Sequence, residues 1–369
     1  MKVLLCTPYN INSRVVQGGI AIWAQNIVNY HQALEDDIHI DIVPFDRKAK
    51  KHPKASYNLL SRAWSGIVDY WKPVRESKKM IKSGRFDVIH LCTSASISLT
   101  KDIAVLRAAR KARIRSIVHF HFGRIPDLAQ KKGWEWKLLK RVVRLADVAV
   151  TMDNSSFEAL QKEGFENVKY LPNPLSEVVS EQIEKGAKDV IREENRICFV
   201  GHVIPTKGVY ELVEACRGIK GIKLYIVGKV TDEVREKMER LSGGGDWMIF
   251  RGEVDHGDVI RELLAASVFD FPTYTEGFPN VILESMACGC SIVTTPVGAI
   301  PEMLNFGTME PCGLRTAVRD VEELRNNILY FINNRDEAQE IAARACQRVN
   351  EMYSIKEVWH QLVRIWQIK

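Results

Sequence analysis

Two carboxylates stand eight positions apart in the stretch "TYTEGFPNVILESMACGC", at Glu276 and Glu284. Glu276 precedes a Gly-Phe-Pro turn, where it can reach the reacting end of a ligand. Glu284 follows an apolar run, where its carboxylate can accept hydrogen bonds from two hydroxyls of a ribose. A glycoside hydrolase pair flanks its bond at about 5–9.5 Å, which a loop and its own following helix fit poorly. A solvated loop acid and a partner of the helix dipole remain alternative readings of the two residues.

The segment between the two acids predicts a helix start. Asn280 is expected to be the N-cap of a helix that runs to Cys288 and is closed by Gly289. The amides of residues 281–283 would then lack partners inside the helix and would point at whatever occupies the cleft.

A lysine follows an apolar run in "FVGHVIPTKG", which contains Gly201, His202 and Lys207. A lysine at a helix start directs an ammonium group and free amides at a phosphate, although the segment lacks the Gly-Lys-Ser/Thr of a Walker A loop. A simple turn is the alternative.

Near the amino terminus, Gly18 and Gly19 precede a predicted helix from Ile20. No G-x-G-x-x-G follows the first apolar run, which disfavours a nicotinamide or flavin dinucleotide. The glycine pair lets backbone amides approach an anion or a sugar, or it is only a permissive turn.

The elements that position these residues alternate between strand-like and helix-like runs, which predicts an α/β fold with two doubly wound sheets. The expected domains are 1–172 and 173–353, joined by a linker near residues 172–190. A final helix over 354–369, capped by Ser354, is expected to pack back on the first domain. Ligands collect beyond the carboxyl ends of such strands, so a cleft between the domains is the expected site. The predicted strands are 3–6, 38–43, 88–91, 117–120 and 148–151, then 197–200, 223–227, 248–250, 268–271 and 291–294.

The composition is that of an ordinary globular protein, with 46% hydrophobic and 27% charged residues in a chain of 369. The apolar runs are shorter than the ~20 residues of a membrane span, and "MKVLLCTPYN" does not resemble a signal peptide. We therefore expect a cytoplasmic location. Eight cysteines need not pair there, and Cys288 and Cys290 are expected to pack in the core rather than bind zinc.

The charge is asymmetric along the chain. Residues 1–180 contain 29 Lys and Arg against 17 Asp and Glu, a net charge of +12, whereas residues 181–369 have a net charge of −6. The basic residues concentrate in 47–54, 107–115 and 131–144. Either these are solvated surfaces or they face an anionic partner, and without nucleic-acid motifs a phospholipid surface at the inner membrane face is the better hypothesis.

Together these stretches resemble the retaining glycosyltransferases of family four, which have the GT-B fold. The resemblance lies in the E-x7-E spacing of "EGFPNVILESMACGCSIVTTPVGAIPEML", with support from "FVGHVIPTKG", "LYIVG", "YLPNPLS" and "SIVHFHFG". It covers nearly the whole chain in the expected order and extends to glycosyltransferases of bacterial polysaccharide biosynthesis.

The resemblance implies roles for individual residues. Glu276, His121 and Lys207 would be catalytic: Glu276 and His121 contact the transferred sugar, and Lys207 neutralises the departing diphosphate. His119, two positions before His121, would share its face of the strand. The implied donor-binding residues are Gly18, Gly19, Gly201, His202, Lys207, Gly277, Phe278, Pro279, Asn280, Val281, Ile282 and Glu284. His202 departs from the family, which usually has arginine there, so diphosphate binding would rest more on Lys207 and on helix amides.

The implied reaction moves a sugar from a nucleotide diphosphate, linked to UDP or GDP, to an acceptor hydroxyl with the anomeric configuration kept. No metal and no other cofactor are implied. The basic first half favours a lipid-linked saccharide as the acceptor. A nucleotide-sugar epimerase of the same fold and a non-catalytic nucleotide-sugar-binding subunit remain alternatives.

Overall fold

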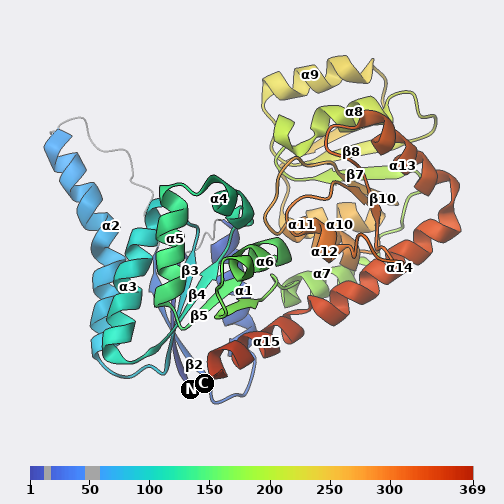
Figure 1. Cartoon of the computed structure of the whole chain (residues 1–369). Coiled ribbons are helices and arrows are strands. Elements are labelled where there is room, and N and C mark those ends of the chain that lie inside the picture. Colours follow the sequence, from blue (N-terminus) through green and yellow to red (C-terminus); the bar gives the residue numbers. More distant parts are fainter. Residues whose placement is uncertain (12–17, 46–58, 369) are drawn as a thin grey trace. The chain divides into compact units, whose positions relative to one another are not determined.

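The computed structural model describes residues 1–11, 18–45 and 59–368, so the basic segment 47–54 lies outside the described residues. The chain divides into two compact units, and each is described by itself. Unit 1 comprises Met1–Pro172 and Trp359–Lys369, and unit 2 comprises Asn173–Val358. Each unit has a six-stranded parallel sheet covered by helices (Figure 1). The predicted α/β class with two doubly wound sheets is therefore confirmed.

The sheet of unit 1 has the order β2-β1-β3-β4-β5-β6. The chain leaves β1 to one side for β2 and returns to its other side for β3, so the topological switch point lies between β1 and β3. Five of the strands were predicted, and the sixth is only three residues long. The strands are β1 (Lys2–Thr7), β2 (His39–Pro44), β3 (Val88–Thr93), β4 (Arg115–Phe120), β5 (Val148–Thr151) and β6 (Val168–Tyr170).

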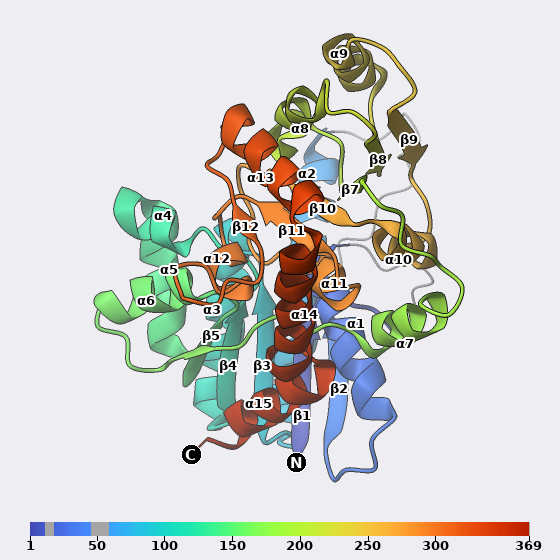
Figure 2. The same ribbon diagram turned by 90° about the vertical axis from the view of Figure 1, so that its right-hand side faces the viewer.

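Helices cover both faces of this sheet, because right-handed crossovers in the two directions place them on opposite sides. α2, α3 and α5 pack side by side over one face (Figure 1). α1 covers the other face together with α15 (Ile355–Gln367), where Trp359 contacts Tyr30 and His31 (Figure 2). The remaining helices are α1 (Gly19–Gln32), α2 (Leu59–Lys82), α3 (Leu99–Ala112), α4 (Ile125–Lys131), α5 (Trp134–Leu145) and α6 (Asn154–Lys162).

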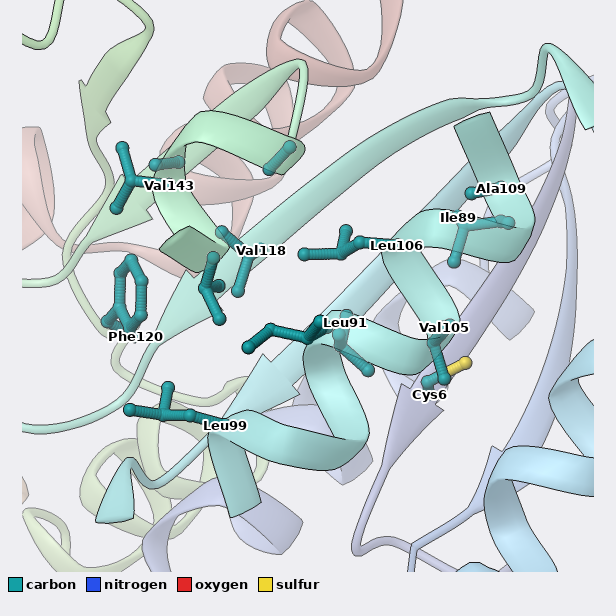
Figure 3. Packing of buried hydrophobic residues seen from close by; sticks show 14 of the residues in the cluster. Cys6, Ile89, Leu91, Leu99, Val105, Leu106, Ala109, Val118, Phe120 and Val143 are labelled. Carbon is teal, nitrogen blue, oxygen red and sulfur yellow. The ribbon is translucent and has the colours of Figure 1, made fainter. Parts of the chain in front are cut away.

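Alternate strand residues separate the two faces of the sheet, as the period of a strand requires. Leu91, Val118 and Phe120 point toward α3 and α5 and form the core with Leu99 and Leu106 of α3 (Figure 3). The residues between them point the opposite way, toward α1 and α15. His90 and His119 belong to this second set.

The sheet of unit 2 has the order β12-β11-β10-β7-β8-β9 and its switch point lies between β7 and β10. Its strands are β7 (Arg196–Val200), β8 (Lys223–Val227), β9 (Met248–Gly252), β10 (Val268–Phe271), β11 (Ser291–Thr294) and β12 (Leu314–Arg315). Its helices are α7 (Glu177–Gly186), α8 (Val209–Cys216), α9 (Asp232–Ser242), α10 (His256–Ala265), α11 (Asn280–Ala287), α12 (Ile300–Met303), α13 (Val321–Asn333) and α14 (Arg335–Met352).

The sequence predicted a linker near residues 172–190, but part of that stretch is helical. Residues Glu177–Gly186 form α7, in which the Ser176 hydroxyl caps the helix by accepting from the amide of Val179 at 3.3 Å. Val179 is buried and Gly186 packs against Leu264 of α10. The apolar residues are few but are spaced for one helix face.

The predicted final helix is present, and the Ser354 hydroxyl accepts from the amide of Glu357 at 3.4 Å, which confirms the cap. In the part of the chain that the structure describes, no helix has the length and apolar character that crossing a membrane requires.

Candidate active site

The loops that follow β7 and β10 meet at the switch point of unit 2. β7 and β10 are paired in the sheet, and the amide of Tyr274 bonds to the carbonyl of Thr206 at 2.9 Å. These contacts bring Lys207 and Glu276 together, so that Lys207 Nζ donates to Glu276 Oε1. The hydroxyl of Thr273 donates to the same oxygen at 3.2 Å.

Both members of this ion pair are mostly shielded, with side-chain exposures of 20% for Lys207 and 14% for Glu276. Lys207 Nζ also lies 5.4 Å from the centroid of the Phe271 ring. A cation and a carboxylate held apart from bulk water interact more strongly than an exposed pair. The pair therefore provides a preset positive group and a preset negative group at the edge where ligands of such sheets bind.

Two glycines allow the backbones of this site to approach one another. A Cβ on Gly208 (φ +70°) would lie 2.0 Å from the carbonyl oxygen of Pro272. A Cβ on Gly298 (φ +58°) would lie 2.5 Å from the carbonyl oxygen of Glu276 and 2.7 Å from that of Gly277. The loop after β11 thus presses directly on the backbone that carries Glu276, and Ala299 donates to the carbonyl of Gly277 at 2.9 Å.

The start of α11 differs from the prediction. Pro279, with φ −77° and ψ 111°, occupies the N-cap position, and Asn280 is the first helical residue and makes no cap bond with its side chain. The proline ring fixes φ, which favours it immediately at a helix start. The amide of Ile282 bonds to the carbonyl of Pro279 at 3.1 Å, so it is not free for an anion. The amides of Asn280 and Val281 come too early in the helix to find an acceptor within it, so they remain available to an anion.

The other residues of this segment serve packing and the end of α11. Phe278 is buried, with its ring centroid 6.0 Å from that of Tyr353. At the other end Gly289 (φ +68°) closes the helix, as predicted. Cys288 and Cys290 are buried free thiols, and among the described residues no group of three or more His, Cys, Asp or Glu is placed to hold a metal ion.

Glu284 lies one turn into α11, as predicted, and it has a partner that the sequence did not reveal. His256 Nε2 lies 3.0 Å from Glu284 Oε1, and His256 Nδ1 lies 3.2 Å from Gln182 Oε1. The hydrogen bond to Glu284, opposed in part by burial, raises the pKa of His256 above its usual value. His256 is the first residue of α10 and follows β9 by four positions, so a search beyond the carboxyl ends of all strands would have found it.

The loop after β7 contains the other predicted residues of unit 2. The amide of Gly201 donates to the carbonyl of Val227 at 3.0 Å, which fixes the loop to the end of β8. His202 is exposed in the same loop.

In unit 1, His121 follows β4 and its amide bonds to the carbonyl of Thr93 at the end of β3, at 3.0 Å. The rings of His119 and His121 lie 3.9 Å apart, so the prediction that they share a face is confirmed. Trp23 of α1 packs against both, with its ring 4.9 Å from each. His90 of β3 completes the cluster, 5.4 Å from His119.

The cluster of Trp23, His90, His119 and His121 is neutral at physiological pH. Burial lowers the pKa of His90 to about 3 and that of His121 to about 3, and it holds the pKa of His119 well below its usual value. The neighbouring histidines add to the lowering for His119 and His121 because like charges repel. A neutral imidazole can donate and accept hydrogen bonds with sugar hydroxyls.

Gly18 and Gly19 lie at the start of α1, on the loop that follows β1. Gly18 (φ +89°) is the N-cap and its carbonyl accepts from the amide of Ile22 at 3.1 Å. Both glycines are exposed, and α1 also carries Trp23 of the histidine cluster. The helix thus links the glycine pair to the cluster within one turn.

Comparisons with known proteins agree with this architecture. The family model described as "Glycosyltransferase Family 4" matches residues 17–177, and the model "Glycosyl transferases group 1" matches residues 194–334. Together they match more than three quarters of the chain. The chain belongs to glycosyltransferase family four. The first match covers the region of the histidine cluster, and the second covers Lys207, Glu276 and Glu284.

Individual relatives of this family-four glycosyltransferase are distant. An uncharacterized 41.2 kDa protein in the cps region of Klebsiella pneumoniae is 22% identical over 94% of this chain and 98% of its own length. The capsular polysaccharide biosynthesis glycosyltransferase CapM of Staphylococcus aureus is 26% identical, and the match spans about half of each chain.

Among solved structures, that of Anabaena HepE in complex with UDP covers 99% of both chains with a TM-score of 0.70 and 16% sequence identity. The likeness identifies the fold of the family-four chain as GT-B.

Proposed function

We propose that this glycosyltransferase moves a sugar from a nucleotide-diphosphate sugar to an acceptor hydroxyl and retains the anomeric configuration. The observation that carries the proposal is the ion pair of Lys207 and Glu276 at the switch point of unit 2, beside the first amides of α11. Breaking the glycosyl bond places negative charge on the diphosphate and positive charge on the sugar. A cation with backbone amides suits the first, and a carboxylate suits the second.

In the proposed reaction, the bond from the anomeric carbon to the diphosphate oxygen breaks and a bond to the acceptor oxygen forms on the same face of the sugar. The acceptor proton passes to the departing diphosphate. Lys207 and the amides of Asn280 and Val281 stabilise the charge on that diphosphate, so the proposal requires no metal. Glu276 and His121 contact the transferred sugar.

Glu284 is proposed to accept the ribose hydroxyls of the donor, since its carboxylate has two oxygens and His256 occupies only one of them. Gly201 and His202 are proposed to line the rim of the donor site of unit 2, and Gly18 and Gly19 are proposed to offer backbone amides at the start of α1. UDP and GDP are the proposed nucleotides, and the structure of HepE contains UDP.

The direct test is a thermal-shift screen with UDP-, GDP- and ADP-sugars, followed by a transfer assay with the donor that stabilises the chain. A ligand at ~100 times its Kd adds ~2.7 kcal/mol of stability. Glu284→Ala should abolish the shift, whereas Glu340→Ala, an exposed acid on α14, should leave it unchanged. If no donor shifts the wild-type chain, the proposal is wrong. Isomerised donor formed without acceptor would instead identify an epimerase, and binding without transfer or hydrolysis would identify a non-catalytic subunit.

We further propose that the acceptor is a lipid-linked saccharide of surface polysaccharide synthesis and that unit 1 meets it at an anionic membrane face. The support is the layer of α2, α3 and α5, named here the basic layer. It exposes cations on three adjacent helices and few acids, and Trp134 at the start of α5 is 57% exposed. The exposed cations are Lys72, Arg75, Lys78, Lys79 and Lys82 on α2, Arg107, Arg110 and Lys111 on α3, and Lys137, Arg141 and Arg144 on α5.

Vesicle sedimentation tests this part of the proposal. Each basic residue near an anionic surface contributes ~1 kcal/mol of attraction, so a triple change of Lys137, Arg141 and Arg144 to Glu should abolish binding to vesicles containing phosphatidylserine. The matched control changes three exposed lysines of unit 2, Lys185, Lys188 and Lys220, to Glu. Equal binding of the wild type to neutral and anionic vesicles at low salt would contradict the proposal of an anionic membrane partner.

A further inference from the structure

The histidine cluster of unit 1 is anchored by a residue from the last helix of the chain. Trp366 of α15 donates from Nε1 to Nδ1 of His90 at 3.0 Å. Both residues are buried, with exposures of 1% and 0%. An indole nitrogen can only donate, so Nδ1 of His90 must accept. Because His90 is neutral, its single ring proton is then on Nε2.

The orientation of His90 matters for the rest of the cluster. Trp23 stacks on His90 with 5.6 Å between ring centroids and 23° between planes. His119 lies edge-on to His90 at 5.4 Å and itself contacts His121 at 3.9 Å. With Trp366 these four rings form one contiguous cluster of contacts, which leads from Trp366 to the residue proposed to contact the sugar.

Few other polar contacts hold the stack in place. Among the residues that the structure describes, Nε2 of His90, both ring nitrogens of His119, Nε2 of His121 and Nε1 of Trp23 are buried without a protein partner. Packing by itself does not select between the two tautomers of a neutral imidazole, or between the two ring orientations that a half-turn relates. The bond from Trp366 makes this selection for His90.

We propose that Trp366 is a positioning residue for the active site: by donating to His90 it fixes the His90 tautomer and ring plane, and through His119 it sets the orientation of His121. The inference rests on the proposed function, in which His121 contacts the transferred sugar. Trp366 touches neither donor nor acceptor in this role. The last helix thereby acts on the proposed sugar contact through the cluster.

A pair of matched substitutions on α15 tests the role. Trp366→Phe keeps an aromatic ring and removes the N–H. Trp359→Phe makes the same change on the same helix, at a residue that is 3% exposed and contacts Trp366, Tyr30 and His31. Misplacing a group by about 1 Å can lower a rate 100-fold, so we expect a loss of ~10-fold in kcat for Trp366→Phe, with the donor KM changed less than ~2-fold. Trp359→Phe should stay within ~2-fold of wild type in both constants.

Equal losses in the two variants would show that only helix packing matters and would overturn the inference. A change in donor KM at constant kcat would also contradict it, because a positioning defect at His121 acts on the reacting sugar. A chain that is active without any response to Trp366→Phe refutes the inference and leaves the proposed function intact. A wild-type chain that transfers from no donor refutes the proposed function, and the positioning role falls with it.

A spectroscopic measurement tests the chemical core without relying on activity. In wild-type chain with ¹⁵N-labelled histidine, the His90 ring should show the Nε2–H tautomer across pH 6–8, assigned by its loss in His90→Phe. Trp366→Phe should convert it to a mixture of tautomers. A wild-type His90 with its proton on Nδ1 would exclude the bond from Trp366 and with it the proposal, even if both variants failed to fold.

A double-mutant cycle completes the test. If Trp366 acts only through His90, then His90→Phe combined with Trp366→Phe should lower kcat no more than His90→Phe does alone. Additive losses would mean that the two residues act independently and would contradict the proposal.

Discussion

The two units present their proposed reactive groups in opposite electrostatic states. In unit 1, burial keeps His90, His119 and His121 neutral, with pKa values lowered below the usual range. In unit 2, Lys207 and Glu276 form a shielded ion pair. Burial without an oppositely charged neighbour favours the neutral form of a group, whereas a neighbour of opposite charge favours the charged form.

This difference matches the two ends of the proposed reaction. The departing diphosphate needs fixed positive groups, and unit 2 provides them at the end of a paired strand. A neutral imidazole beside the sugar can bond to hydroxyls without repelling the positive charge that develops there. We therefore expect unit 2 to respond to changes in charge and unit 1 to changes in shape and hydrogen bonding.

The largest effect is expected from removing either charge of the central pair in unit 2. Lys207→Ala and Glu276→Ala should each lower kcat at least ~100-fold, which corresponds to about 3 kcal/mol of transition-state stabilisation. Each change also leaves the other member of the ion pair shielded from water without its partner. Steady-state kinetics with the donor found in the screen measures both, and Glu340→Ala serves as the control. Near-wild-type turnover in either variant would reject the role of that residue.

The sequence predicted that Lys207 and Glu276 both lie beyond the carboxyl end of a strand, where ligands of parallel sheets bind. Both residues follow strands, and in a parallel sheet the carboxyl ends of neighbouring strands lie at one edge. Which strands are neighbours was not predictable, since the order β10-β7 arises from the crossovers. The strands missed, β6 and β12, have three and two residues, too few to show a pattern.

The misjudged details depend on backbone angles and on packing between elements. Asn280 has a good capping side chain, but Pro279 fixes the dihedral that decides where α11 begins. His256 reaches Glu284, and Gln182 reaches His256, because α7, α10 and α11 pack together, which no local pattern encodes. Trp366 fitted a helix pattern in the sequence, and its bond to His90, 276 positions earlier, became visible only in the fold.

A backbone substitution separates position from charge in unit 2. Gly298→Ala adds a Cβ that would lie 2.5 Å from the carbonyl of Glu276, so the loop carrying that residue must move. We expect a loss of ~10-fold in kcat, although every charge of the site is kept. Gly307→Ala is the control, since that glycine also has positive φ but no neighbour within 4 Å of the added atom. Equal losses in the two variants would attribute the effect to strain alone.

Unit 1 also contains a buried acid, which extends the comparison to stability. Burial raises the pKa of Asp102 to about 7, against a smaller lowering by its bond from Thr93 at 2.6 Å. Because the folded state holds this proton and the unfolded chain releases it near pH 4, the free energy of unfolding should fall as pH rises from about 4 to about 7.

Asp102→Asn should remove that dependence and be more stable than wild type by ~1–2 kcal/mol at pH 8, since an ionised buried carboxyl is unfavourable. Urea unfolding at pH 5 and pH 8 measures the difference, with Asp127→Asn, an exposed acid of α4, as the control. A wild-type stability that rises between pH 5 and pH 8, unlike that of Asp102→Asn, would contradict a neutral Asp102.

The smallest expected effect is a change of nucleotide affinity with pH, and it concerns His256. This histidine of unit 2 bonds to Glu284 of the proposed donor site. The bond to Glu284 raises the pKa of His256, and the charged groups that face it are Glu284 and Asp255, while α7 contributes the neutral Gln182. The ring therefore stays positive above pH 6.5 and loses its charge as pH rises through the raised value. A positive ring offsets the charge of Glu284 toward an anionic nucleotide, so nucleotide affinity should fall as pH rises from 7 to 9.

The imidazole is 47% exposed, which limits the effect to the ~0.2–1 kcal/mol of a solvated pair, or a change in Kd of about 1.4-fold to five-fold. The window lies above pH 7 because the terminal phosphate oxygens of a diphosphate titrate near pH 6. His256→Gln keeps a donor for Glu284 without a titrating group, so its Kd should be flat with pH, whereas His360→Gln, an exposed histidine of α15, should follow the wild type. Calorimetric titration at pH 7, 8 and 9 distinguishes the two. If Kd changed with pH equally in the wild type and in His256→Gln, the group whose titration lowers the affinity would not be His256.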